Sequence, residues 1–136
     1  MPLVRITIAR GMSAASQRAV ADGVHRALVE TSNVPADDRF QVIEEVSAEQ
    51  LVFDQRYLGI ERRGPVVFVQ VFLNLGRSLE VKKALYARIA DNLAADPGVR
   101  REDVLVSLVE VPKENWSFGA GLMSYEPTAP PPGVTK

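Results

Sequence analysis

The strongest constraint on the fold of this 136-residue chain is an internal repeat. Shifted by 65 residues, the sequence aligns with itself without a gap from Val4/Val69 to Val46/Val111. The identical pairs fall where structure is expected to change, at turns, helix caps and helix ends, and they include Gly11/Gly76, Ser13/Ser78, Leu28/Leu93 and Asp38/Asp103. Self-similarity of this kind indicates two copies of one supersecondary unit.

The first copy has the pattern of a strand, a helix and a second strand. Residues 3–8 alternate between the two faces with a period of two, which is typical of a half-buried strand. Ser13 can cap the helix that follows, and Asn33 suits the left-handed position just after a helix. A second strand is expected near residues 39–46.

The second copy repeats this pattern. Strands are expected at 66–73 and 104–111, and the helix between them begins after Ser78 and ends at Asp96-Pro97-Gly98. A strand–helix–strand connection of this length is parallel and right-handed. The sequence therefore predicts an α+β fold: two tandem β-α-β units that form a four-stranded sheet with two helices on one face.

These units predict a single domain over residues 1–126. The units occupy 2–46 and 66–111, and a connecting loop at 47–65 joins them. A loop of this length is usually functional or contacts a partner. The Pro-rich end, residues 127–136, is expected to be a flexible tail.

One predicted strand is apolar on both faces. Val67 and Val69 can face the helices, whereas Phe68 and Phe72 point the other way. Because a strand that is apolar on both faces is buried on both faces, the second face needs a cover. We expect another subunit to supply it; the alternative is that loop 47–65 folds over it.

The composition excludes several classes of function. A net charge of −1 without clustered Lys and Arg argues against nucleic acid or an acidic membrane surface as the partner. With no cysteine and a single histidine, His25, no metal site is expected. His25 itself is expected to face solvent or the helix edge. No segment has the pattern of a signal peptide or a membrane span, so we expect a cytoplasmic protein.

Pro2 is the first candidate for chemistry. Removal of the initiator Met would leave a secondary amine at the start of a buried strand. Such an amine can act as a general base or acid toward a carbon next to a carbonyl. The alternative is that Pro2 is only the second residue of the chain.

Arg77 is a candidate for binding an anion. It lies between Gly76 and the Ser78 cap, where the free amides of a helix N-terminus and a guanidinium together suit a carboxylate. The matching residue of the first copy is Met12, so the fold does not need an arginine there. The alternative is a solvated surface arginine.

Asp38 and an aromatic pair complete the set of candidates. Asp38 precedes the second strand and can orient a water or hold the Pro2 ammonium. Asp103 repeats it in the other copy, so a structural acid is the alternative. Trp116 and Phe118 can wall an active site and exclude water, or they can close a core or a subunit contact.

Together these residues resemble the tautomerase superfamily, and within it the malonate semialdehyde decarboxylase-like group. The resemblance covers about residues 2–125. It rests on the Pro that follows the initiator Met, on the doubled β-α-β unit, and on three stretches: Gly76-Arg77-Ser78, Val34-Pro35-Ala36-Asp37-Asp38-Arg39-Phe40-Gln41 and Glu114-Asn115-Trp116-Ser117-Phe118-Gly119.

The resemblance implies a homotrimer that needs no cofactor and acts on a small carboxylate substrate. Pro2 would be the acid/base, and Arg77 would hold the substrate carboxylate and polarise its carbonyl. Asp38 would position a water or the amine. Trp116 and Phe118 would line the pocket.

The sequence leaves the reaction open. The decarboxylase group carries a second arginine close before the one that matches Arg77, whereas residues 74–76 here are Asn-Leu-Gly. If Arg77 and the aromatic residues dominate, the pKa of the Pro2 amine falls and Pro2 is a base suited to keto–enol tautomerisation. If Asp38 lies beside the amine, Pro2 is an acid suited to decarboxylation or hydration.

An interpretation of another class is a non-catalytic module. The doubled pattern also fits ferredoxin-like domains that bind small molecules or assemble into oligomers. Such a module would not depend on Pro2.

Overall fold

The computed structural model describes residues 2–127 and has one four-stranded sheet with the order β2-β1-β3-β4. β1 is parallel to β2, β3 is parallel to β4, and the central pair β1 and β3 is antiparallel. The elements in chain order are β1 (Leu3–Ala9), α1 (Ala14–Thr31), β2 (Phe40–Val46), β3 (Val67–Asn74), α2 (Leu79–Ala95) and β4 (Val104–Val111). The predicted α+β fold of two β-α-β units is confirmed. Most of the predicted tail, residues 128–136, lies outside the described residues.

Both helices begin at the predicted caps. The Ser13 hydroxyl oxygen accepts the Ser16 N–H at 3.1 Å, and the Ser78 hydroxyl oxygen accepts the Val81 N–H at 3.2 Å. These bonds satisfy amides of the first turn that have no partner within the helix. Asn33 adopts the expected left-handed conformation, with φ of 56°.

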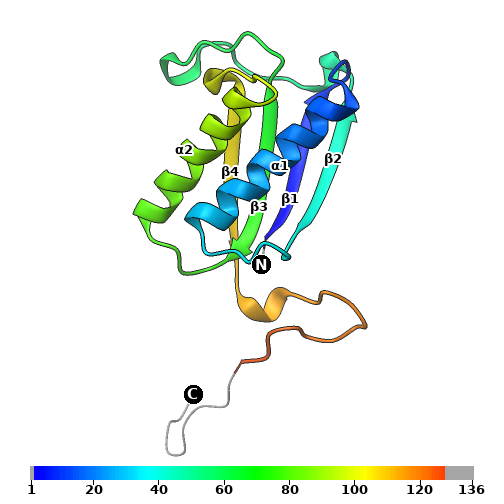
Figure 1. Cartoon of the computed structure of the whole chain (residues 1–136), viewed down its shortest axis with the longest axis vertical. Helices are drawn as coiled ribbons and strands as arrows, with labels where there is room; N and C mark the ends of the chain where they lie inside the picture. Colours follow the sequence, from blue (N-terminus) through cyan, green and yellow to red (C-terminus); the bar gives the residue numbers. More distant parts are fainter. Residues whose placement is uncertain (1, 128–136) are drawn as a thin grey trace, which may run out of the picture.

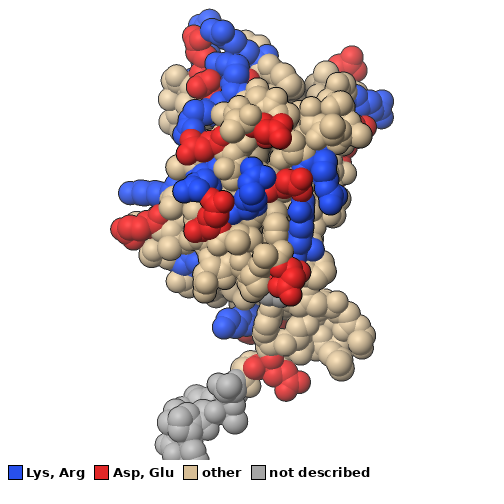
Figure 2. Space-filling model, viewed as in Figure 1, with Lys and Arg blue, Asp and Glu red and all other residues tan. Residues whose placement is uncertain are grey.

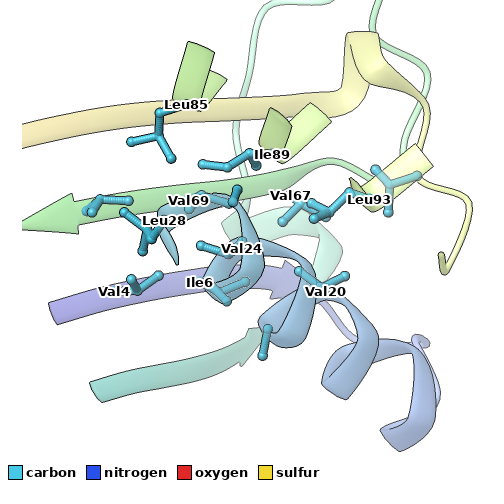
Figure 3. Close-up of a cluster of buried hydrophobic side chains, with 14 of the residues drawn as sticks. Val4, Ile6, Val20, Val24, Leu28, Val67, Val69, Leu85, Ile89 and Leu93 are labelled. Carbon is cyan, nitrogen blue, oxygen red and sulfur yellow. The ribbon is translucent and has the colours of Figure 1, made fainter. Parts of the chain in front are cut away.

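The two helices lie side by side on one face of the sheet (Figure 1). The core lies between the layers, where Val4, Ile6, Val69, Leu85 and Ile89 are almost fully buried (Figure 3). Truncating a buried Leu or Ile to Ala in such a core costs about 2–5 kcal/mol.

The helices approach each other closely at Gly23. A Cβ at this position would lie 2.9 Å from Leu93 Cδ1, so only a glycine fits without movement. The contact brings the two units into one core.

The opposite face of the sheet is left open by the described chain. One apolar row crosses all four strands there, because Leu3 lies beside both Phe40 and Phe72, and Phe72 lies beside Val109. Phe40 is 44% exposed, and Val42 and Leu105 are exposed as well. Loop 47–65 therefore does not cover this face.

The prediction for His25 is wrong. Its side chain is buried, and Nε2 lies 2.9 Å from the carbonyl oxygen of Ala36. The segment that follows α1 returns over this side of the helix and provides both the cover and the hydrogen-bond partner.

Charged side chains of both signs are interspersed over the helical face (Figure 2). Several form ion pairs, such as Arg88 with Glu30, which links α2 to α1. Within residues 2–127, no helix is long and apolar enough to cross a membrane.

Candidate active site

The sheet topology gathers the predicted site residues at one end of the molecule. Pro2 directly precedes β1, and Asp38 precedes β2, which runs parallel to β1. Arg77 follows the end of β3, which is antiparallel to β1, so it returns to the same end. Trp116 and Phe118 follow β4, which runs parallel to β3; the N-terminus and the C-terminal segment accordingly lie at one end in Figure 1.

A cavity of about 660 Å³ lies at this end, between the end of α1, the turn before α2 and the C-terminal segment. Arg77 and Lys113 contribute charged side chains to its wall, and no acidic residue among residues 2–127 lines it. Ser32, Asn33 and Tyr125 add polar groups. The wall is therefore suited to a small anion.

Arg77 is held in place by two backbone carbonyls. Its Nη1 donates to Asn74 O at 3.2 Å, and its Nη2 donates across to Ser32 O at 3.0 Å, in the other unit. Its Nε is buried and has no hydrogen-bond partner within the described residues. A buried donor without an acceptor costs about 1–3 kcal/mol, so the fold holds Arg77 here at a cost.

The charge of Arg77 persists at this site. Burial lowers the pKa of the Arg77 guanidinium, and the charge of Glu110 acts in the opposite direction. An arginine remains protonated at neutral pH, so the site keeps its cation.

Asp38 is only 6% exposed. Burial raises the pKa of its carboxyl, and the positive charge of the amino terminus acts in the opposite direction.

The predicted aromatic pair forms a stack that is bonded to Asn74, one of the residues that line the cavity. The rings of Trp116 and Phe118 lie 5.1 Å apart and are nearly parallel, and Phe118 also packs against Phe40. Trp116 Nε1 donates to Asn74 Oδ1 at 2.7 Å, which ties the C-terminal segment to the end of β3. The aromatic residue that lines the cavity with Arg77 is Tyr125.

Sequence reasoning did not single out Tyr125. Its ring packs edge-on against Phe118, at 5.9 Å between centroids. It follows a turn that contains two glycines with positive φ, Gly119 and Gly121. No hydrophobic period crosses such a turn, so the sequence carries no signal for the return of the chain to the cavity.

A second cavity, of about 600 Å³, lies at the opposite end of the sheet. Its lining residues Ala9, Gly11 and Met12 are the counterparts, 65 positions earlier, of Asn74, Gly76 and Arg77. The shift also relates lining residues on the other side of each cavity: Ser32 and Pro97, Asn33 and Gly98, Pro35 and Arg100. The repeat thus builds the same cavity twice.

Two sequence families match this chain. Residues 38–119 match a family described as "Tautomerase enzyme", and residues 2–59 match a second family with the same description. The chain belongs to the tautomerase superfamily of enzymes.

Individual relatives agree with this assignment. The chain is 37% identical to the "Probable tautomerase YusQ" of Bacillus subtilis over 121 residues, which cover 89% of this chain and 95% of the relative. The crystal structure of FG41 malonate semialdehyde decarboxylase inhibited by 3-bromopropiolate superposes with a TM-score of 0.86 at 37% identity, over 90% of this chain and 93% of that one. A structure described as a fused 4-OT wild type symmetric trimer superposes with a TM-score of 0.73 at 26% identity, over 88% and 94% of the two chains.

Proposed function

We propose that this enzyme acts without a cofactor on a small oxo acid and uses the nitrogen of Pro2, freed by removal of Met1, as its acid/base. The observation that carries the proposal is the position of Arg77 in a cavity wall that includes no acidic residue among residues 2–127. Its Nη1 and Nη2 each donate one hydrogen bond to a backbone carbonyl, and each carries a second N–H. A substrate carboxylate accepts from these second N–H groups. Pro2 and Asp38 lie at the same end of the sheet.

In this proposal Arg77 binds the substrate carboxylate and polarises the carbonyl beside it. The carbonyls of Asn74 and Ser32 hold the guanidinium before substrate arrives, so little orientation is lost on binding. Lys113 adds a second positive charge to the wall. Trp116 and Phe118 back the wall and exclude water from that side.

Asp38 favours the protonated form of Pro2. Burial raises the pKa of Asp38 overall, but the charge of the amino terminus acts to lower it. This electrostatic effect is reciprocal, so an ionised Asp38 raises the pKa of an amine at the start of the chain. Pro2 is then an ammonium that delivers a proton, which suits decarboxylation or hydration. In decarboxylation of a 3-oxo acid, the bond to the carboxylate carbon breaks, CO₂ leaves, and the electron pair forms an enolate. The Pro2 ammonium protonates the enolate carbon and regains its proton from water.

Keto–enol tautomerisation is the second candidate. The positive charges of Arg77 and Lys113 disfavour an ammonium close to them, which lowers the pKa of the Pro2 amine and makes it a base. A neutral Pro2 would take a proton from one carbon of the substrate and return it to another. The two candidates therefore differ in the pKa of Pro2.

The open face of the sheet supports a homotrimer as the working assembly. The apolar row through Phe40, Leu3, Phe72 and Val109 needs a cover, and the described chain supplies only the contact of Phe118 with Phe40. Three copies of the domain at residues 1–126, packed through these faces, would bury it. A homotrimer gives an apparent mass three times 14.9 kDa in sedimentation.

A titration of the Pro2 nitrogen by ¹⁵N NMR on untagged protein tests the proposal. A pKa above the ordinary range of about 7.7–8.0 supports decarboxylation or hydration, and a pKa below it supports tautomerisation. Turnover of small oxo acids by the wild type and by Pro2→Ala completes the test, and the variant is expected to fold and to lose most turnover. Retained Met1 with no titrating amine, or full turnover by Pro2→Ala, contradicts the proposal and favours the non-catalytic ferredoxin-like module.

A further inference from the structure

The cavity at the opposite end of the sheet has a more apolar wall than the cavity that contains Arg77. At three equivalent positions it has an apolar residue where the first cavity has a polar one: Ala9 for Asn74, Met12 for Arg77 and Pro97 for Ser32. Pro65 and the buried Val99 add further apolar surface. Small-molecule sites have volumes of about 300–1,000 Å³ and are mostly apolar with a few polar groups. The second cavity, of about 600 Å³, fits this description.

Two arginines and one aspartate are the charged residues of this wall among the described residues, namely Arg10, Arg100 and Asp103. Both carboxylate oxygens of Asp103 already accept hydrogen bonds. Oδ1 accepts the N–H groups of Arg63 and Gly64, and Oδ2 accepts from Arg100 at 3.2 Å. Asp103 and Arg100 are therefore engaged with the fold and with each other, and the wall keeps one further cation.

That cation is Arg10, which directly follows β1. Its backbone N–H donates to Val46 O at 2.8 Å, so the base of the side chain is fixed at the end of the strand. The side chain is exposed, and its guanidinium makes no hydrogen bond or ion pair with any of residues 2–127. A long side chain of this kind can turn to an anion at the rim of the cavity and form a charge-assisted hydrogen bond with it.

One such cation beside an apolar wall suits an amphipathic anion. A phosphate would lose its water against the apolar surface and gain too few hydrogen bonds in return. A monocarboxylate with a short hydrocarbon chain matches both parts of the wall, because its carboxylate needs a single arginine and its chain buries apolar surface against Met12 and Val99.

We propose that the cavity lined by Arg10 and Met12 is a second, non-catalytic binding site for a monocarboxylate with a short hydrocarbon chain. Arg10 pairs with the carboxylate, and the chain lies against the apolar wall. The site is at the opposite end of the sheet from Pro2 and Arg77, so it does not depend on the proposed function.

Hexanoate and acetate test this inference, because they share the carboxylate and differ in the hydrocarbon chain. Each is titrated into ¹⁵N-labelled full-length protein. The amide signals of Gly11 and Gly98 report on the second cavity, whereas the signal of Gly76 reports on the first. Hexanoate is expected to shift Gly11 and Gly98 saturably and to bind there at least about 10-fold more tightly than acetate.

Two variants locate the cation. Arg10→Gln removes the charge of an exposed side chain and is expected to weaken hexanoate binding at Gly11 and Gly98 by about 3- to 10-fold. Arg56→Gln makes the same change at an exposed arginine of loop 47–65 that lines neither cavity, and it is expected to match the wild type. The amide spectrum of each variant also checks that the fold is kept.

The wild type alone can overturn the inference. If hexanoate shifts only Gly76, or shifts none of the three signals, the second cavity is not a carboxylate site. If acetate binds at Gly11 and Gly98 as tightly as hexanoate, the apolar wall does not select the ligand and the inference fails. Hexanoate binding to Arg10→Gln that equals wild-type binding overturns it as well, because the carboxylate then has another partner.

Discussion

The two β-α-β units share a backbone, yet the cavities at their ends are chemically different. The cavity at the start of α2 contains Arg77, whereas its counterpart at the start of α1 contains Met12. Gly76 and Gly11 adopt similar positive φ angles, 117° and 121°, so the turn is the same in both units. The comparison teaches that the repeat supplies the cavity and that a few side chains decide what it can bind.

The paired aspartates Asp38 and Asp103 also differ. Asp103 is 1% exposed, and its carboxylate accepts the N–H groups of Arg63 and Gly64 and a hydrogen bond from Arg100. It anchors the end of loop 47–65 to β4. Asp38 occupies the equivalent position in the other unit, where burial raises its pKa. One acid is thus committed to structure, and the other is disfavoured in its charged form.

A third pair lies beside the two turns. Lys82 donates to Glu110 at 2.6 Å, and in the other unit Gln17 bonds Glu45 at the matching positions. Glu110 also accepts the Gly76 N–H at 3.4 Å. The unit that contains Arg77 therefore has a Lys82–Glu110 ion pair beside its turn. The unit that contains Met12 has a hydrogen bond from the neutral amide of Gln17 to Glu45 at the same place.

Replacing Arg77 with the residue of the matching turn in the first unit is expected to have the largest effect on activity. Arg77→Met makes the second unit resemble the first and removes the cation that the substrate carboxylate needs. We expect kcat/KM for a small oxo acid to fall by about 10²–10³-fold. Steady-state kinetics measure the loss, and circular dichroism checks the fold. The reciprocal control Met12→Arg is expected to keep wild-type activity; equal losses in both variants would contradict the assignment of the site.

Removing Asp103 is expected to have the largest effect on stability. Asp103→Ala leaves the buried N–H groups of Arg63 and Gly64 without their acceptor and should cost about 2–4 kcal/mol. Urea unfolding measures the loss. A change as small as that of the exposed neighbour variant Glu102→Ala would show that the anchor contributes little.

Asp38→Asn is expected to stabilise the protein, whereas Asp103→Ala is expected to destabilise it. Because the folded state raises the pKa of Asp38 above its unfolded value, the ionised carboxylate destabilises the fold at pH values above the folded pKa. This penalty shrinks as pH falls through the folded pKa and is absent below the unfolded pKa. The variant should therefore be more stable than the wild type at neutral pH, and the gain should disappear in acid.

The free energy of unfolding of the variant and the wild type, measured between about pH 3 and 7, tests this prediction, because carboxyl groups titrate in about this range. Asp37→Asn, which changes the exposed neighbouring carboxylate, is the matched control. A stability gain that stays constant across this range would mean that ionisation of Asp38 is not its cause.

The smallest expected effect on activity comes from changing the Lys82–Glu110 ion pair. Lys82→Gln copies the first unit and leaves the Glu110 charge uncompensated beside Arg77. Because the pair is partly exposed and screened, we expect KM for an oxo acid to rise by only about 2- to 5-fold with kcat unchanged. Gln17→Lys at the other turn should leave KM unchanged. A fall in kcat without a rise in KM would assign Lys82 a different role.

The sequence by itself determined the local elements and the parallel pairing of strands within each unit. Strand alternation, the Ser13 and Ser78 caps and the positive-φ turns are local signals, each contained within a few residues. Once the repeat is recognised, the parallel connection places Pro2 and Asp38 at one end. The antiparallel pairing of β1 with β3, a tertiary contact, brings Arg77 to the same end.

Only the tertiary structure decided which side chains share a cavity. His25 is buried by a segment that follows its helix, Asp103 is held by amides about 40 positions earlier in the chain, and Tyr125 lies in the wall of the cavity that Arg77 lines. These contacts join segments that irregular turns separate. No sequence period crosses such turns, so the positions of these residues depend on how the whole chain packs.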